Sequence, residues 1–363
     1  MHFPRRLALT LPALLPAVAR AQDAEQLPGG LRLATFASGL EYPWGANFLP
    51  DGRLLVTERP GRMRLVTPDG HVSAPLAGLP EVEAVGQGGL LDVVVAPDFT
   101  RSSEIFFAAA VSTGEGALTR LYRARLGGSG LAEVRPVLDA TPGQSRGRNH
   151  FGGRLAFSPD GAHLFLTTGD RNEKRDRAQR LDDLAGKVIR LTRNGEVPRD
   201  NPFFGRPGAR GEIFSFGHRN PQGIAFNPAT GSLFEVEFGP LGGDEVNLIR
   251  PGQNYGWPEV TYGREYSGRP INNGRTSAPG FVEPQRHWEP AISPSGMCFW
   301  RGALWLACLN PPGLLRIAME GDRLGGEERL WQRRARCRHV VPAPDGSLLV
   351  LTDESRGRIL RIA

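Results

Sequence analysis

The segment FLPDGRLLVTERPGRMRLV, residues 48–66, contains the unit from which this chain is built. Two apolar residues lead into Pro-Asp-Gly, which is followed by alternating apolar and polar residues, a polar turn and a second alternation. Proline fixes φ and glycine accepts a positive φ, so Pro-Asp-Gly between two such runs is typical of a tight turn that joins strands. The alternation of period two indicates strands that are buried on one face. The segment therefore predicts antiparallel strands packed on one side.

Related versions of this unit occur five more times along the chain. They are VAPDFTRSSEIFFAAAV (95–111), FSPDGAHLFLTTGD (157–170), FNPATGSLFEVEFG (226–239), CFWRGALWLACLNPPGLLRI (298–317) and PAPDGSLLVLTDESRGRILRI (342–362). Repetition of one supersecondary unit is the sequence signature of a repeat architecture. Six such units favour an all-β fold, a six-bladed β-propeller with four-stranded blades around a central channel, over a solenoid or a sandwich.

The composition agrees with that fold. The 363 residues include 47 Gly and 31 Pro, yet 40% are hydrophobic and lie in patterned runs, which indicates many turns between buried strands rather than disorder. No change of composition marks a second domain, so residues 22–363 are expected to form a single propeller domain. The only helical pattern is a short one around residues 177–185.

The first 21 residues have the features of a secretory signal peptide. Arg5 and Arg6 precede an apolar run over 7–18, and Ala-Arg-Ala at 19–21 is a small-x-small cleavage site. The run is too short and too interrupted by proline to span a bilayer, and nothing downstream resembles a transmembrane helix. We therefore expect a periplasmic or secreted protein with no membrane span, while the paired arginines leave Sec and twin-arginine export both open.

Charge and cysteine content argue against other classes of protein. The formal net charge is +6, but the basic residues are scattered rather than gathered in a stripe with aromatic residues, which argues against nucleic acid as a partner. Cys298, Cys308 and Cys337 are too few for a disulfide scaffold and lack the spacing of metal ligands. One disulfide with a free thiol and three buried thiols both remain open.

The segment GRNHFGGRL, residues 147–155, places His150 directly before one of the predicted strands. In a propeller, the loops at one end of the innermost strands meet at the axis. Asp170 lies at the far end of the neighbouring strand, so it is expected at the same end of the ring as His150. From these residues alone, a packed or solvated imidazole remains an alternative to a catalytic one, and a turn-forming role remains open for the aspartate.

Seven motifs occur in order between residue 34 and the C-terminus. They are GQGGLLDVVVAPDF, HFGGRLAFSPDG, TTGDR, GHRNPQGIAF, EFGPLGGDEVNLI, NYGWP and RCRHVVPAPDG. Together they resemble the soluble, pyrroloquinoline quinone (PQQ)-dependent sugar dehydrogenases, the glucose and aldose sugar dehydrogenase family. The resemblance implies a propeller enzyme that uses PQQ and Ca²⁺.

In that family the histidine that heads the GGRL strand is the general base. The resemblance thus makes His150 the acceptor of the proton of a sugar C1 hydroxyl while hydride leaves C1 for the quinone. Asp170 matches the aspartate that orients this histidine and stabilises its protonated form. Arg219 and Asn220 match cofactor residues beside the reactive carbonyl, where an arginine can stabilise developing negative charge. A surface salt bridge for Arg219 and a plain turn for Asn220 are the alternatives.

The metal site that the resemblance implies lies in EFGPLGGDEVNLI. The family binds Ca²⁺ through two consecutive backbone carbonyls, here Gly239 and Pro240, and Asp244 and Glu245 are close enough in sequence to hold or tune the ion. Bound to an ortho-quinone, Ca²⁺ acts as a Lewis acid on the carbonyl that receives hydride. A solvated acidic turn is the alternative for the two carboxylates.

Three further residues are implied to bind the cofactor. Gln87 lies in GQGG, and Arg336 and Arg338 have the i, i+2 spacing that points both side chains to one face of a strand. Asn310 stands where the family usually has a lysine that clamps the cofactor, and His339 stands where an aspartate is common. These two departures predict weaker cofactor binding than is usual for the family.

The sequence thus predicts an enzyme that oxidises an aldose sugar at C1 to its lactone with PQQ and Ca²⁺ and passes the electrons to an external acceptor. Trp288 is a candidate for stacking on the sugar, with a place in the core as the alternative. The rival functions are a calcium-dependent hydrolase such as a lactonase, and a non-catalytic binding propeller. The particular sugar, the electron acceptor, and whether the chain is a monomer or a homodimer are left open.

Overall fold

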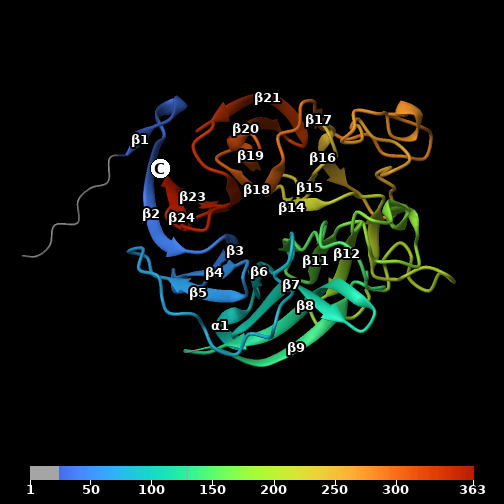
Figure 1. The fold of residues 1–363 in the computed structure, drawn as a ribbon. Coiled ribbons are helices and arrows are strands. Elements are labelled where there is room, and N and C mark those ends of the chain that lie inside the picture. Colours follow the sequence, from blue (N-terminus) through green and yellow to red (C-terminus); the bar gives the residue numbers. More distant parts are fainter. Residues whose placement is uncertain (1–23, 129) are drawn as a thin grey trace, which may run out of the picture.

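The computed structural model describes residues 24–128 and 130–363, and these residues form six antiparallel sheets arranged as a ring (Figure 1). The predicted signal peptide lies outside the described residues. In chain order, the first five sheets are β3 (Pro43–Phe48), β4 (Leu54–Glu58) and β5 (Arg62–Val66); β6 (Leu90–Val95), β7 (Glu104–Thr113), β8 (Gly116–Leu126) and β9 (Leu131–Asp139); β10 (Leu155–Phe157), β11 (His163–Thr168), β12 (Lys187–Thr192) and β13 (Ile213–Phe216); β14 (Pro221–Phe226), β15 (Leu233–Glu237), β16 (Asp244–Ile249) and β17 (Arg286–Trp288); β18 (Pro294–Trp300), β19 (Ala303–Leu309), β20 (Pro312–Glu320) and β21 (Arg323–Leu330).

The sixth sheet joins the two ends of the described chain. Its strand order is β1 (Glu25–Gln26), β2 (Arg32–Leu40), β24 (Gly357–Ile362), β23 (Leu348–Thr352) and β22 (Cys337–Pro342). Strand β2 pairs antiparallel with β24, and Leu33 lies opposite Ile362. An early strand therefore completes the last blade and closes the ring.

The innermost strands of the six sheets enclose the axis of the ring. They are β3, β6, β10, β14, β18 and β22; each contacts the next in this order, and β22 contacts β3. The predicted six-bladed propeller is confirmed. Four blades have the predicted four strands, whereas the blade of 43–66 has three strands extended by one bridge between Val66 and Val72, and the last blade has five.

The repeated Pro-Asp-Gly turns join the innermost strand of a blade to the second strand. In the first blade the turn separates Phe48 from Leu54, which are paired, and Gly52 has φ 84°, which glycine adopts without a steric cost. The turn of the third blade separates the paired residues Phe157 and Leu164 in the same way. These turns thus lie at one end of the ring, and the residues that precede the innermost strands meet at the other end.

Apolar side chains pack between neighbouring blades. One buried cluster joins Phe106 on β7, Leu166 on β11 and Ile189 on β12. Burying a side chain of this size contributes about 1.5–3 kcal/mol. The three cysteines are unpaired and buried, and burial raises the pKa of each thiol, so the alternative of three buried thiols holds.

Helical structure is limited to short segments in the described residues. They are α1 (Phe99–Ser102) and the 3₁₀ helices η1 (Pro28–Gly30), η2 (Arg175–Gln179) and η3 (Asn272–Gly274). The helix expected around 177–185 was wrong in extent, because the backbone is extended at Arg180 and the buried Arg177 guanidinium binds Asp183 instead of continuing a helical turn. In the described part of the chain, no helix has the length and apolar character needed to cross a membrane.

Candidate active site

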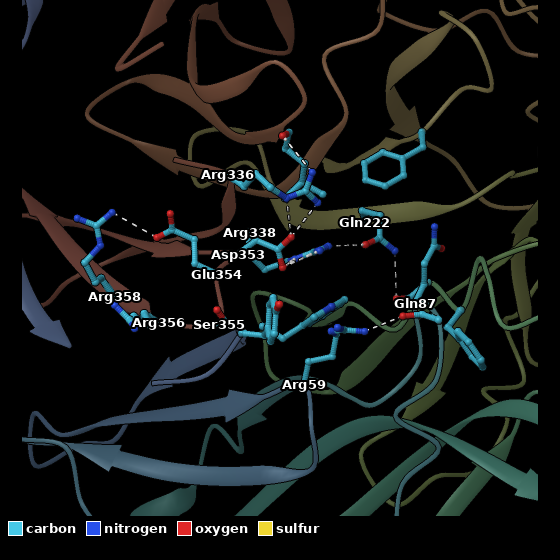
Figure 2. Close-up of a pocket in the computed structure, with 17 residues that line it drawn as sticks. Arg59, Gln87, Gln222, Arg336, Arg338, Asp353, Glu354, Ser355, Arg356 and Arg358 are labelled. Carbon is cyan, nitrogen blue, oxygen red and sulfur yellow. Dashed lines mark hydrogen bonds and ion pairs between the residues drawn. The ribbon is translucent and has the colours of Figure 1, made fainter. Parts of the chain in front are cut away.

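A cavity of about 900 Å³ opens at the end of the ring where the innermost strands begin (Figure 2). Its walls come from different blades and include Trp44 on β3, Gln87 before β6, Gly152 before β10, Gln222 on β14 and Arg338 on β22. A cavity of this size is typical of small-molecule and cofactor sites. The propeller thus brings residues from distant parts of the chain to one pocket.

His150 is buried and absent from the cavity lining, but it directly precedes Phe151 and Gly152, which line the cavity, and it is held by contacts on both sides. Its backbone N–H donates to Gln87 Oε1 at 2.8 Å, and its Nδ1 lies 2.7 Å from Asp170 Oδ1. Asp170 is itself fixed, because Trp257 Nε1 donates to its Oδ2 at 2.6 Å and the Asn172 N–H donates to its Oδ1 at 2.7 Å. With Nδ1 engaged by the carboxylate, the neutral imidazole carries its proton there and its lone pair on Nε2.

The electrostatics of this pair favour a neutral imidazole beside an ionised carboxylate. Burial lowers the pKa of His150, and the positive charges of Arg219 and Arg171 lower it further, while Asp170 opposes them. Burial works against ionisation of Asp170, but its contacts with His150 and the charge of Arg219 outweigh burial and hold its pKa below the usual value. The Arg171 guanidinium is buried and stacks 3.5 Å from the ring centre of Phe151. The lowered pKa therefore favours a neutral imidazole at His150, whose Nε2 carries a lone pair.

Arg219 and Asn220 lie beside this pair, on the loop that leads into β14. The Glu237 carboxylate holds the loop by accepting from both backbone N–H groups, at 2.5 and 3.2 Å. Arg219 Nη1 donates to the carbonyl oxygens of Phe238 at 3.0 Å and Gly239 at 2.7 Å. Among the residues that the structure describes, Arg219 Nε and Asn220 Nδ2 are buried donors for which no hydrogen-bond partner is present. Two such donors next to a histidine suit a ligand rich in oxygen acceptors.

Arg336 and Arg338 both line the cavity, on one face as their spacing predicts (Figure 2). They share one carboxylate, because Arg336 Nη2 donates to Asp353 Oδ2 at 2.8 Å and Arg338 Nη2 lies 3.0 Å from Asp353 Oδ1. Arg338 also donates to Gln222 Oε1 and to Ser295 Oγ, each at 3.3 Å. Two guanidinium groups with one carboxylate leave a net positive charge, which suits an anionic ligand.

The four residues predicted to bind calcium have different surroundings. The Asp244 carboxylate is buried and accepts from the backbone N–H groups of Gly239, Ile292 and Ser293 at 2.8, 2.7 and 2.6 Å, so it organises the turn. Burial raises the pKa of Asp244 despite these bonds.

Glu245 has a different position, in a small cavity that is also lined by Gly239 and Glu237. Burial, and then the charge of Glu237, raise the pKa of Glu245 well above its ordinary value. A cation bound here would offset both the burial of the Glu245 carboxylate and its repulsion by Glu237. Carboxylate and carbonyl oxygens are also the donors that Ca²⁺ prefers. The residues present thus fit Ca²⁺: Gly239 and Glu245 line the small cavity, Pro240 directly follows Gly239, and Asp244 holds the turn through the Gly239 N–H.

Three other residues from the sequence analysis lie away from the cavity lining. Asn310 is exposed in the turn between β19 and β20, whereas its neighbour Leu309 lines the cavity. His339 lies on β22, where burial and the charges of Arg154 and Arg338 hold its pKa well below the ordinary value. Trp288 is buried in the core between blades and its Nε1 donates to Glu327 Oε2 at 3.0 Å, so its place in the core holds rather than the sugar-stacking one.

Sequence reasoning missed several residues that form the site. Asp353 follows β23 in the unit 342–362, and Gln222 lies inside the GHRNPQG motif; both positions were visible as strand ends. Trp257 lies in NYGWP, and its contact with Asp170 joins residues 87 apart in sequence. Asp353 could have been found from the sequence, because an acidic residue at the end of the strand that pairs with the one beginning beside Arg336 and Arg338 is the expected partner of two arginines.

Comparison with known proteins places this site in context. The chain matches the glucose/sorbosone dehydrogenase family model over residues 40–361. It is 40% identical over 364 residues to aldose sugar dehydrogenase YliI of Escherichia coli K12, covering 96% of this chain and 97% of that protein. A solved glucose dehydrogenase is 44% identical with a TM-score of 0.88, covering 91% of this chain and 98% of that one.

A second solved structure is the PQQ-bound form of aldose sugar dehydrogenase from Streptomyces coelicolor. It is 30% identical with a TM-score of 0.78, and the match covers 92% of this chain and 98% of that one. The family resemblance carried by the seven motifs is therefore confirmed. With the same fold, and a sequence match that extends over nearly all of the propeller, the chain belongs to the glucose/sorbosone dehydrogenase family.

Proposed function

We propose that this protein oxidises an aldose sugar at C1 to the lactone, with PQQ in the 900 Å³ cavity and Ca²⁺ beside it. The observation that carries the proposal is the buried His150–Asp170 pair, with a nitrogen–oxygen distance of 2.7 Å, next to the unpartnered donors of Arg219 and Asn220. The PQQ-bound relative of 30% identity supports the choice of cofactor. Gln87, next to His150, and the arginines Arg336 and Arg338 line this cavity and would hold the cofactor.

The chemistry assigned to the chain's own residues is proton transfer and charge stabilisation. His150 Nε2 accepts the proton of the C1 hydroxyl, because Nδ1 is held by Asp170. Asp170 then stabilises the imidazolium that forms, while Trp257 keeps the carboxylate in place. When bound, PQQ would supply the acceptor for the hydride of C1. Arg219 lies where a fixed positive charge favours the negative charge that develops during transfer.

Calcium is proposed to bind at the Gly239 and Pro240 carbonyls, with Glu245 as its carboxylate neighbour and Asp244 shaping the turn. The Gly239 oxygen now accepts a hydrogen bond from Arg219, so coordination of a cation there would use the same oxygen. The calcium-dependent hydrolase is less well supported. Such an enzyme needs carboxylates around a metal on the axis, whereas the buried Arg154 and Arg338 reach the centre of this ring.

The wider setting of the enzyme is also a proposal. Residues 1–21 would direct export to the periplasm or beyond, and residues 22–363 would act as one propeller domain. The substrate is a small sugar, and the electrons pass to an external acceptor.

Reconstitution tests this function directly. Protein stripped with a chelator is expected to reduce a redox dye in the presence of aldoses only after PQQ and Ca²⁺ are both added. Mg²⁺ is expected to restore less activity, since carbonyl and carboxylate oxygens in a flexible site suit the larger ion. The lactone should be trapped with hydroxylamine. Hydrolysis of added lactones with Ca²⁺ alone, without PQQ, would instead support the hydrolase.

The pH dependence of turnover is predicted by the lowered pKa of His150. The base must be neutral to accept a proton, and burial keeps it neutral at pH values where an ordinary histidine is protonated. In reconstituted enzyme, the acid limb of the kcat profile is therefore expected below the ordinary value of 6.5. An acid limb clearly above 6.5 would contradict this prediction. It would show either that a different group limits turnover or that His150 is protonated at neutral pH.

A further inference from the structure

Arg154 is a buried cation at the centre of the ring. It directly precedes β10 and is 1% exposed. Its guanidinium donates to three backbone carbonyls, from Nε to Gln222 at 2.6 Å, from Nη1 to Trp44 at 3.2 Å and from Nη2 to Arg338 at 2.9 Å. These acceptors lie on β14, β3 and β22, so one side chain ties together the innermost strands of three other blades.

Two more contacts complete the surroundings of this guanidinium. Asp92 on β6 lies 3.5 Å from Nη1, and the second oxygen of Asp92 accepts from the Leu155 N–H at 3.1 Å. The guanidinium carbon lies 3.9 Å from the ring centre of Trp44. Burial lowers the pKa of Arg154 to about 10, which leaves the group charged at neutral pH. Arg154 leads into β10, and its guanidinium contacts residues on β3, β6, β14 and β22. Five of the six innermost strands are therefore linked through this cation.

The three residues whose carbonyls Arg154 binds also line the 900 Å³ cavity. They are Trp44, Gln222 and Arg338. Gln222 and Arg338 in addition bind each other across the cavity at 3.3 Å, and Arg338 continues the network to Asp353. Moving any of these carbonyls would move the side chain attached to the same residue. Arg154 itself is absent from the cavity lining, so it acts on the cavity only through its neighbours.

We propose that Arg154 is a positioning residue for the cofactor cavity, which holds Trp44, Gln222 and Arg338 at the spacing that PQQ requires. This inference rests on the proposed function. The simplest alternative is that Arg154 only stabilises the propeller. The two roles differ in what is lost on substitution, because a structural residue affects unfolding alone, whereas a positioning residue also affects cofactor affinity in protein that remains folded.

Arg177 offers a matched control. It is also a buried arginine, 5% exposed, and it donates to Asp183 Oδ2 at 2.8 Å and to the Pro142 carbonyl at 2.7 Å. It does not line the cavity. Arg154→Lys and Arg177→Lys both keep the charge but lose the planar fork that serves several acceptors. Both variants are therefore expected to unfold at a lower temperature.

The test is a titration of each purified protein with PQQ at saturating Ca²⁺, followed by tryptophan fluorescence, together with thermal unfolding. Arg154→Lys is expected to raise the Kd for PQQ about tenfold or more, since at least one charged hydrogen bond to a carbonyl is lost. At saturating PQQ its kcat is expected to stay within about threefold of wild type, because the base and Arg219 are untouched. Arg177→Lys should leave the Kd unchanged.

An unchanged Kd for Arg154→Lys, with a loss of thermal stability like that of Arg177→Lys, would reduce Arg154 to a structural role. If Arg154→Lys does not fold, Asp92→Asn serves instead, because it removes the charge that anchors the guanidinium and keeps the side-chain shape. Its Kd is expected to rise, and an unchanged value would overturn the proposal. Failure of the wild-type protein to bind PQQ would refute the proposed function, which separates the two results.

Discussion

Replacement of His150 by alanine is expected to lower kcat by about 10²–10⁴, the usual contribution of a positioned general base. In the proposed site the buried imidazole offers Nε2 to the substrate, because its Nδ1 is held by Asp170. Alanine removes the proton acceptor but leaves the arginines that would hold the cofactor. The Kd for PQQ should therefore change little. Steady-state kinetics on a panel of aldoses, with enzyme saturated in PQQ and Ca²⁺, measures the loss.

His163→Ala provides the control for this experiment. His163 lies on β11, away from the cavity lining, where its Nε2 contacts Arg190 Nη2 at 3.0 Å. The control is expected to retain the kcat of wild type. If His150→Ala turns over every aldose at the wild-type rate, His150 is not the base and the site has to be reassigned.

Asp170→Asn is expected to cost about 10²–10⁴ in kcat, because an amide at this position favours the wrong histidine tautomer. Both carboxylate oxygens accept from fixed donors, Trp257 Nε1 at one oxygen and His150 Nδ1 with the Asn172 N–H at the other. An amide NH₂ in either place opposes one of these donors. If it faces His150, it donates to Nδ1 and leaves the proton on Nε2, where a base is needed.

A double variant separates a catalytic pair from independent effects. If His150 and Asp170 act as one unit, His150→Ala with Asp170→Asn should be no slower than His150→Ala alone. Losses that multiply would show that Asp170 works through something other than the histidine. Thermal unfolding of Asp170→Asn should be recorded alongside, because the buried amide also weakens contacts with Trp257.

The propeller could be predicted from sequence because its information is local and repeated. Each Pro-Asp-Gly turn fixes a hairpin through its own backbone preferences, and each alternation fixes which face of a strand is buried. The strand that closes the ring was not predicted. Its partner, β24, lies at the other end of the chain, and no local pattern in residues 32–40 records that pairing.

The candidate site was predictable where a motif carries chemistry, as at His150, Arg219 and the pair Arg336 and Arg338. It was not predictable where function depends on distances between blades. Arg154 looks like an ordinary basic residue before a strand, yet its acceptor on β22 is 184 residues away. Asn310 was predicted to contact the cofactor, but it is exposed in the turn after β19. The residue before it, Leu309, lines the cavity instead.

The pairing of β2 with β24 also has a consequence for the stability of the site. Leu33 and Ile362 lie nearly the whole chain apart. Arg336, Arg338 and Asp353 all belong to this last blade. The arginine-rich side of the cavity thus lies on the one blade whose outer edge is supplied from the other end of the described chain, so removing β2 is expected to weaken the blade that carries Arg336, Arg338 and Asp353.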